Sequence, residues 1–120
     1  MTRVYVAGRY SADNIMEGLN NIRRGIEISR DLLLKGYAPF CPWLDCMYVL
    51  TASCHDFINM NKQMFQDCSM AWVEASDCLL VTSMSNGVQR EIDRAKELGI
   101  PVFETVLALD QWAHDMTRRG

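Results

Sequence analysis

Residues 78–91 join an apolar strand to residue types that bind anions and attack electrophiles. The strand gives way to a run of hydroxyls and a glycine, and a helix carrying Glu91 follows. Gly87 allows backbone N–H groups to approach a ligand closely, and a helix start offers unpaired donors and partial positive charge. Ser83 and Ser85 add hydroxyl groups. The segment therefore predicts an anion-binding site.

Glu91 is expected to do chemistry beside that anion site, because a bound phosphate needs no carboxylate and would be repelled by one. Our interpretation is that Glu91 acts on a sugar. A structural alternative stays open, since the helix dipole favours a first-turn Glu by roughly 0.3–1 kcal/mol without any function. Asn86 fits a structural role, as an N-cap with Gln89 completing a capping box, and Gly87 is compatible with a plain turn.

Length, composition and charge limit the classes of protein to which this chain can belong. With 120 residues and 49% hydrophobic content, the chain is expected to be one domain, residues 1–120, with a sizeable core. The net charge is −3 and the basic residues occur in isolated pairs, such as Arg23 with Arg24, which argues against a polynucleotide partner. The sequence contains no apolar segment long enough for a signal peptide or a membrane span. A cytoplasmic location is therefore expected.

The five cysteines are expected to be reduced thiols, because their number is odd and their spacing irregular. Cys41, Cys46, Cys54 and His55 form a conceivable zinc set, but the paired CxxC spacing is absent. We therefore predict no metal and no cofactor. Cys68 and Cys78 are interpreted as small core residues.

Strands are predicted to alternate with helices along the whole chain. Short strands are expected at residues 4–7, 37–40, 78–82 and 102–103, and glycine-terminated helices at 15–35 and 88–98. A loop at 41–54 should precede another helix, and a last helix should follow the fourth strand. The apolar stripe of the helix after the loop is interpreted as core; its members are Phe57, Met60, Met64, Phe65, Cys68 and Trp72.

This alternation requires crossover connections and predicts a small doubly wound α/β domain, flavodoxin-like or Rossmann-like, with a parallel sheet of four or five strands and helices on both faces. Ligands of such sheets bind outside the carboxyl ends of the strands. Those ends are residues 8–11, 41–43, 82–91 and 104–105. Asp77 lies at the opposite end of its strand and is interpreted as structural.

The spacing Ser85-x-Gly87-x-x-x-Glu91, followed by Arg94 and Ala95, resembles the nucleoside 2-deoxyribosyltransferase superfamily. Residues 4–8 with Tyr10, residues 36–42 and residues 72–81 extend the resemblance over most of the chain. Within the superfamily, the chain resembles the 2′-deoxynucleoside 5′-phosphate N-hydrolases, and it resembles more strongly a poorly characterised bacterial and phage branch that shares the Ser-x-Gly-x-x-x-Glu element.

The resemblance implies that Glu91 attacks or supports the anomeric carbon of a (deoxy)ribose whose 5′-phosphate is held by the loop of residues 85–87. The transition state is oxocarbenium-like, so a carboxylate beneath the ring stabilises it or bonds to it. It also implies a homodimer or higher homo-oligomer. The expected substrate-binding set is Gly8, Arg9, Tyr10, Ser11, Ser83, Ser85, Asn86 and Gly87.

The chain departs from this family at the acid that protonates the leaving base. The N-hydrolases carry an acidic residue one helical turn before the position of Trp72, where this chain has Ser69, and Asp67 is about 200° away round the helix. Three other residues are candidates to compensate: Asp45, His55 and Glu104. The alternative function is a non-catalytic module that senses or sequesters a nucleotide through the same loop. Hydrolysis and transfer both stay open, as do the base and the sugar.

Overall fold

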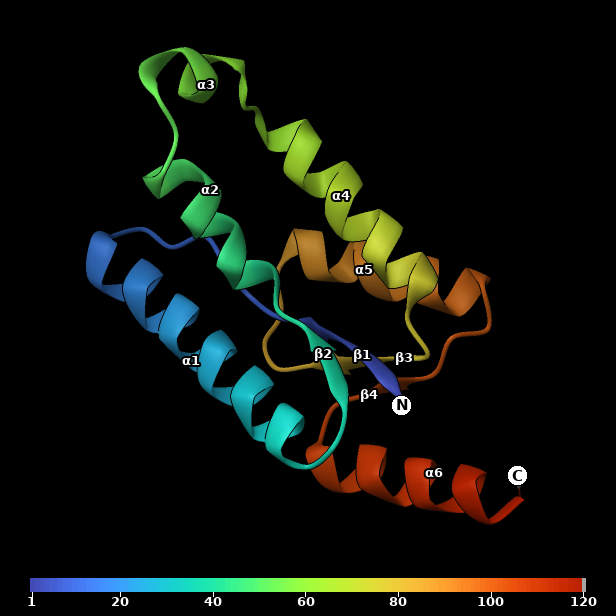
Figure 1. Cartoon of the computed structure of the whole chain (residues 1–120). Coiled ribbons are helices and arrows are strands. Elements are labelled where there is room, and N and C mark those ends of the chain that lie inside the picture. The colour runs from blue at the N-terminus through green and yellow to red at the C-terminus, as the bar shows by residue number, and fades with distance from the viewer. Residues whose placement is uncertain (120) are drawn as a thin grey trace.

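The computed structural model describes residues 1–119 and contains a parallel sheet of four strands in the order β2-β1-β3-β4 (Figure 1). Each neighbouring pair of strands is parallel. The predicted small doubly wound α/β fold is therefore confirmed, with four strands. Their bounds are β1 (Arg3–Ala7), β2 (Ala38–Phe40), β3 (Cys78–Val81) and β4 (Val102–Phe103).

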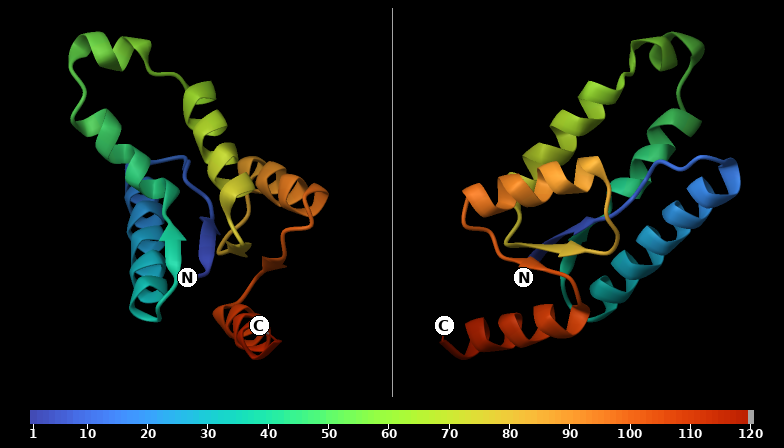
Figure 2. Two further views of the ribbon diagram at one scale, coloured as in Figure 1. Left: turned by 45° about the vertical axis from the view of Figure 1, so that its right-hand side comes forward. Right: turned by 180° about the vertical axis from the view of Figure 1, so that it is seen from behind.

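Helices cover both faces of the sheet, as predicted. One face packs on α1 and α6, and the other on α4 and α5, as the two views of Figure 2 show. A short 3-10 helix, η1, and the small helices α2 and α3 connect β2 to α4. The bounds are α1 (Ile15–Leu34), η1 (Pro42–Asp45), α2 (Cys46–Leu50), α3 (Cys54–Asn59), α4 (Lys62–Ala75), α5 (Asn86–Glu97) and α6 (Val106–Arg119).

The central strand β1 divides its side chains between the two layers, because successive residues of a strand point to opposite faces. Val4 and Val6 pack with α1 and α6. Tyr5 and Ala7 pack on the side of α4 and α5. A phenol thus enters an otherwise apolar layer directly below the helix that carries Glu91.

The helix ends agree with the predicted glycine stops. Gly36 follows α1 with φ of 96°, and Gly99 follows α5 with φ of 72°. A left-handed residue after a helix ends the regular hydrogen bonding, and glycine adopts that conformation without a steric cost. These two positions therefore set where the chain turns back toward β2 and β4.

Two predictions for residues 41–75 are wrong. The expected loop contains η1 and α2, since Pro42 starts a helical turn. The single helix expected around Trp72 is divided at Met60, whose backbone is extended. The division follows from local capping: the Ser53 hydroxyl accepts a hydrogen bond from Asp56 N at 3.1 Å, and Asn61 Oδ1 accepts one from Met64 N at 3.0 Å. Each cap starts its own helix.

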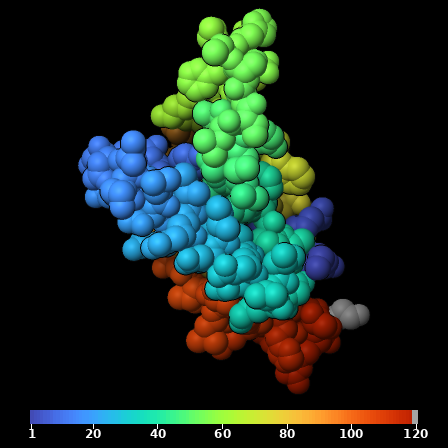
Figure 3. Space-filling view, turned by 60° about the vertical axis from the view of Figure 1, so that its left-hand side comes forward, coloured from blue at the N-terminus to red at the C-terminus, as the bar shows by residue number. Residues whose placement is uncertain are grey.

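The interpretation of the Met and aromatic stripe as core is also wrong. Phe57 is 58% exposed, Met64 53% and Trp72 48%. Cys68 is exposed, whereas Cys78 is buried as predicted. The reason is that α2 and α3 rise away from the sheet and α4 reaches it only with its last turns, so the outer part of the stripe has no layer to pack on. Figure 3 shows this green segment projecting from the body.

Asp77 has the predicted structural role at the amino end of β3. One carboxylate oxygen accepts a hydrogen bond from Arg3 N at 2.8 Å, and the other pairs with the Arg3 guanidinium at 3.3 Å. These contacts, led by the backbone bond, lower the pKa of Asp77. They hold the starts of β1 and β3 together, far from the carboxyl ends.

Two kinds of feature are absent from the described residues. Within residues 1–119, no helix combines the length and the apolar character needed to cross a bilayer. No group of three or more His, Cys, Asp or Glu side chains in that part of the chain is arranged to hold a metal ion. The conceivable zinc set of Cys41, Cys46, Cys54 and His55 is therefore not brought together.

Candidate functional site

A cleft of about 920 Å³ lies at the carboxyl ends of β1 and β3. The strand order changes direction between these two strands, and such switch points open a crevice in doubly wound sheets. The loops after β1, β2 and β3 all contribute to the cleft, as the strand-end rule predicts. Residues 104–105, after β4, do not line it.

Glu91 lies inside this cleft, on the inward face of α5. Val88, Ile92 and Ala95 form the buried stripe of that helix, and position 91 falls within it. The carboxylate accepts a hydrogen bond from the phenol of Tyr5 on β1. A carboxylate thus occupies a place that helical periodicity assigns to an apolar side chain.

The surroundings of Glu91 shift its pKa in both directions, and the net shift is upward. Burial raises the pKa of the carboxyl, while the hydrogen bond from Tyr5 and the charge of Arg90 lower it. The pKa of Tyr5 is raised, first by burial and then by the charge of Glu91. The phenol therefore stays protonated and donates, and the carboxylate is the acceptor.

Tyr5 is held in place by a stack of aromatic rings. Its ring centroid lies 5.5 Å from that of Phe40 on β2, with the planes 19° apart. Phe40 stacks in turn on Trp72 of α4, at 4.9 Å and 18°. Stacked rings restrict the movement of the phenol. The orientation of the Glu91 carboxylate is consequently set by three elements: β1, β2 and α4.

The start of α5 forms one side of the cleft. Ser85 is the N-cap: its hydroxyl accepts a hydrogen bond from Val88 N at 3.2 Å. The interpretation of Asn86 as the cap is wrong, because Asn86 is already the first helical residue, and Gln89 donates to Asp93 at 2.9 Å instead of completing a capping box. Gly87 is helical and not a turn residue, and it lines the cleft together with Asn86 in the first turn of α5, where backbone N–H groups have no partner within the helix.

The loop after β1 forms the opposite rim, with Gly8, Arg9, Tyr10 and Ser11 all lining the cleft. Arg9 N donates to the Ser83 hydroxyl at 2.7 Å, and Arg9 Nε donates to Ser11 O at 3.2 Å. Ser83 therefore ties the loop after β3 to the loop after β1, but it does not itself line the cleft. The other predicted substrate-binding residues all do.

Trp43 forms part of the cleft floor and is buried. Its indole Nε1 donates to Arg9 O at 3.1 Å. The ring lies against two glycines: a Cβ at Gly8 would approach Thr82 Oγ1 to 2.3 Å and the ring to 2.6 Å, and one at Gly25 would approach the ring to 2.0 Å. The indole fits here because glycine has no Cβ at either position.

The remaining lining residues include both charged and apolar side chains. Arg9, Lys62 and Arg90 bring positive charge to the lining, and Arg90 lies close to Gly87 at the start of α5. Phe65, Met70 and Met84 offer apolar surface, and Gln66 and Ser69 add polar groups. This combination suits a ligand with an anionic end and a flat, weakly polar end.

The acids proposed to compensate for Ser69 are separated by the structure. Asp45, at the end of η1, lines the cleft, whereas His55 and Glu104 do not. Ser69 itself lines the cleft. Asp67 lies outside it, where its carboxylate accepts a hydrogen bond from Gln63 at 2.7 Å. The expectation that Asp67 does not take the place of Ser69 is thus consistent with its position on α4.

Tyr5, which bonds to Glu91 in the cleft, was not predicted from the sequence. The sequence did contain an indication: a tyrosine within a buried strand of a parallel sheet needs a hydrogen-bond partner for its hydroxyl group. Lys62 and Arg90 were also missed. Their positions on exposed helical turns carry no local signal, and only the packing of α4 beside α5 brings them to one cleft.

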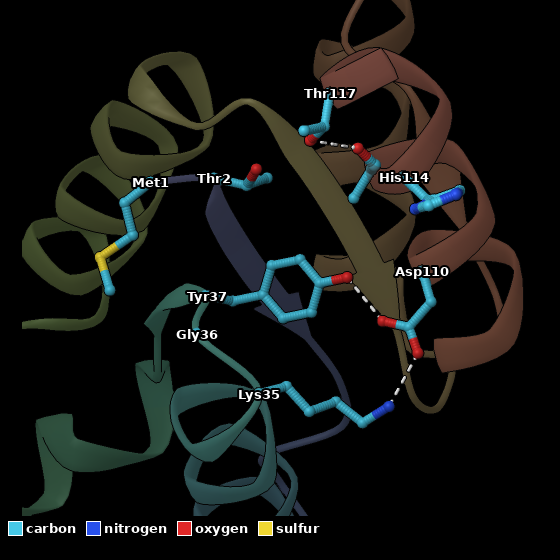
Figure 4. A pocket seen from close by; sticks show the side chains of 9 residues that line it. Met1, Thr2, Lys35, Gly36, Tyr37, Asp110, His114 and Thr117 are labelled. Atoms are coloured by element: carbon cyan, nitrogen blue, oxygen red, sulfur yellow. Dashed lines mark hydrogen bonds and ion pairs between the residues drawn. The ribbon is translucent and has the colours of Figure 1, made fainter.

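A second pocket, of about 540 Å³, lies near the amino end of β1, between the end of α1 and α6. Figure 4 shows Tyr37 and Lys35 pointing at Asp110, whose carboxylate accepts from the phenol at 2.5 Å and from the ammonium at 2.7 Å. These bonds, led by that of Lys35, lower the pKa of Asp110. The network docks α6 against the end of α1, and we assign it a structural role.

Comparison with curated proteins found no match for the chain. A family model, described as a domain of unknown function (DUF7768), matches residues 2–105. That span runs from β1 to β4 and includes every residue that lines the cleft, whereas α6 lies beyond it. The chain thus belongs to the family of domains of unknown function DUF7768.

Proposed function

We propose that this protein cleaves or transfers the N-glycosidic bond of a (deoxy)nucleoside or its 5′-monophosphate, with Glu91 as the nucleophile. The observation that carries the proposal is the Glu91 carboxylate, which lies within the switch-point cleft, bonded to a buried phenol, beside the start of α5. The resemblance to the nucleoside 2-deoxyribosyltransferase superfamily points to the same residue.

The chemistry follows from a fixed carboxylate facing a sugar. As the bond from C1′ to the base nitrogen breaks, positive charge develops on C1′ and the ring oxygen. An ionised Glu91 stabilises that charge and bonds to C1′. Tyr5 holds the carboxylate in one orientation, so little reorganisation is needed when the charge develops. Water or a second base then takes the sugar from Glu91.

The start of α5 is the proposed seat of the 5′-phosphate. Backbone N–H groups at a helix start bind phosphate without a side chain, and Gly87 leaves room for it, because a Cβ there would meet Ser85 Oγ only at 3.8 Å. Arg9 and Arg90 add positive charge on either side.

Replacing Gly87 by Ala tests the phosphate seat. The methyl group should occupy space meant for the ligand and weaken binding of a deoxynucleoside 5′-monophosphate by roughly 10-fold to 100-fold, the worth of one or two charged hydrogen bonds. Helix propensity should leave the variant as stable or up to about 1 kcal/mol more stable. Titration calorimetry checks the affinity. The nucleoside without phosphate is the control ligand, and an equal loss of affinity for both ligands would contradict the proposal.

The function is tested by following release of the base. The protein is incubated with a panel of deoxynucleosides and their 5′-monophosphates, and free base is separated by chromatography. Turnover supports the glycosidase. Binding without turnover across the whole panel supports the alternative, a non-catalytic nucleotide-binding protein that senses or sequesters its ligand. One observation favours the alternative: this chain has Ser69 at the position where the N-hydrolases carry the acid that protonates the leaving base.

We further propose that the protein is a homodimer and that the apolar arm is its contact surface. The apolar arm comprises α2 and α3, residues 46–60, and Asp56 is its only charged side chain. Each copy would bring a single carboxylate and a largely apolar surface to such a contact, and exposed apolar patches mark interaction sites. Val49 of the arm also lines the cleft, so a partner would lie next to the site. The exposed members are Met47, Tyr48, Val49, Leu50, Phe57 and Ile58.

Ile58→Glu should convert the dimer to a monomer, because a charge would be buried in the contact. Ile15→Glu is the matched control, since both isoleucines are 79% exposed and Ile15 lies outside the arm. Sedimentation velocity at tens of micromolar measures the mass. A monomeric unmodified protein, or dissociation by the control substitution alone, would refute the assignment of the arm.

A further inference from the structure

We infer that Asp45 is the acid that protonates the departing base, an assignment that rests on the proposed function. Asp45 lies in the same cleft as Glu91 but on a different wall, at the end of η1, whereas Glu91 projects from α5. A sugar attacked from the side of α5 would leave its base facing other walls of the cleft. One of these carries a second carboxyl group.

The elimination of the other acids supports Asp45. Ser69 cannot protonate a base efficiently because a hydroxyl is too weak an acid at neutral pH. His55 and Glu104 lie outside the cleft, and so does Asp67. Asp13, the remaining acid of the cleft besides Glu91, is exposed in the loop after β1. Asp45 is half-buried.

The position of Asp45 is fixed by a rigid neighbour. Trp43 stands two residues before it in η1 and is buried against Gly25 of α1. Its indole is also bonded to Arg9 O at 3.1 Å. A short helix anchored by a buried indole fixes the backbone of Asp45 at the wall of the cleft, and a positioned acid is what general acid catalysis requires.

The electrostatic surroundings agree with an acid role. Burial raises the pKa of Asp45, which favours the protonated form that can donate. The charge of Asp45 in turn raises the pKa of Tyr5 and of Tyr10, so the carboxyl lies within electrostatic range of the phenol that holds Glu91. Burial raises the pKa of Glu91 as well, but Glu91 also accepts a hydrogen bond from Tyr5 that favours its ionised form, whereas burial is the only influence on the pKa of Asp45. The two carboxyl groups thus have environments suited to different roles.

The proposed step balances as follows. The bond from C1′ to the base nitrogen breaks and its electron pair goes to the base, which takes the proton of the Asp45 carboxyl. A Glu91 oxygen forms the new bond to C1′. In the second half, water attacks C1′, the Glu91 oxygen leaves, and the ionised Asp45 takes the proton from the water. The cycle ends with Asp45 protonated and Glu91 ionised, as it began.

The Asp45→Asn variant tests the acid role by comparing a substrate whose base needs a proton in order to leave with one whose base does not. The substrates are 2′-deoxyguanosine 5′-monophosphate and its N7-methylated form, whose cationic base departs without being protonated. We expect the single-turnover rate of base release by the variant to fall roughly 10²-fold to 10⁴-fold on the first substrate, the usual worth of a general acid, and less than about 5-fold on the second, because a single turnover of base release does not include the later step in which Asp45 activates water. Asp67→Asn, an acid of α4 outside the cleft, should leave both rates unchanged.

Each other outcome overturns the assignment. Retention of the rate on the neutral base shows that Asp45 is not the acid, and an equal loss on both substrates shows a structural role. Release of the methylated base alone by the unmodified protein shows that no acid operates. Release of base from neither substrate overturns the proposed glycosidase as well, so failure of the function is distinguishable from failure of Asp45 alone.

Discussion

Replacing Glu91 by Gln is expected to lower the rate of base release by at least about 10³-fold, because a neutral amide neither bonds to C1′ nor stabilises its positive charge. Binding of the nucleotide should persist, since the start of α5 and the apolar part of the cleft are unchanged. Base release by chromatography and affinity by calorimetry, measured on the same preparation, check the two halves of the prediction.

The Glu91→Gln variant should also fold normally. Its amide oxygen can still accept the hydrogen bond from Tyr5. Burial raises the pKa of Glu91 above that of the unfolded carboxyl, so the stability linked to protonation is complete below the unfolded pKa and is lost as pH rises through the folded pKa. The amide does not ionise, so above the folded pKa the variant should be at least as stable as the unmodified protein. The difference should shrink at acidic pH.

A Glu91→Gln variant that still releases base at more than about a tenth of the original rate would eliminate Glu91 as the nucleophile. A loss of binding along with turnover would instead assign Glu91 to ligand recognition. Either result, with normal thermal unfolding, would leave the nucleotide-binding alternative as the better account of the cleft.

Gly25→Ala is expected to destabilise the protein by about 2 kcal/mol or more, or roughly 8 °C in Tm. The new methyl group would lie 2.0 Å from a ring atom of Trp43, so the indole or α1 must move. The indole is buried and bonded to Arg9 O, which leaves it little room to shift. Because the same ring forms part of the cleft floor, ligand affinity should fall as well.

Gly18→Ala in the same helix is the matched control. A Cβ at Gly18 would meet no atom within 4 Å, so only the helix propensity changes. That substitution should stabilise the protein by about 0.5–1 kcal/mol. Thermal and urea unfolding of the two variants measure the contrast. If Gly25→Ala is as stable as Gly18→Ala, Trp43 does not pack closely on α1 in solution.

The fold was largely predictable because it depends on local patterns. Short apolar runs alternating with periodic helices leave few arrangements other than a parallel sheet with a helix layer on each face. The rule that ligands bind at strand ends then located the cleft, with Glu91 and the loop of residues 85–87 in it. The helical spacing of Val88, Ile92 and Ala95 also indicates that Glu91 lies on the same inward face of the helix, which supports its place in the cleft.

The segment of residues 41–75 was predicted poorly for an equally physical reason. An apolar stripe at helical spacing indicates a face that avoids water, but it does not identify what covers that face. The capped starts at Ser53 and Asn61 were readable as two helices. The exposure of Phe57 was not readable, because it depends on how far α3 stands from the sheet.

By itself, the sequence determined how the four strands alternate with α1, α5 and α6, the end of the sheet where a ligand is expected to bind, and the carboxylate expected to act there. These follow from periodicity, turn chemistry and the backbone donors at a helix start, all of which are local in the chain. Only the tertiary structure decided that Tyr5 bonds to Glu91, that Asp45 rather than His55 or Glu104 lines the cleft, and that Trp43 rests on Gly25. Each of these contacts joins residues from separate elements, and their meeting depends on strand order and helix packing, which no local pattern encodes.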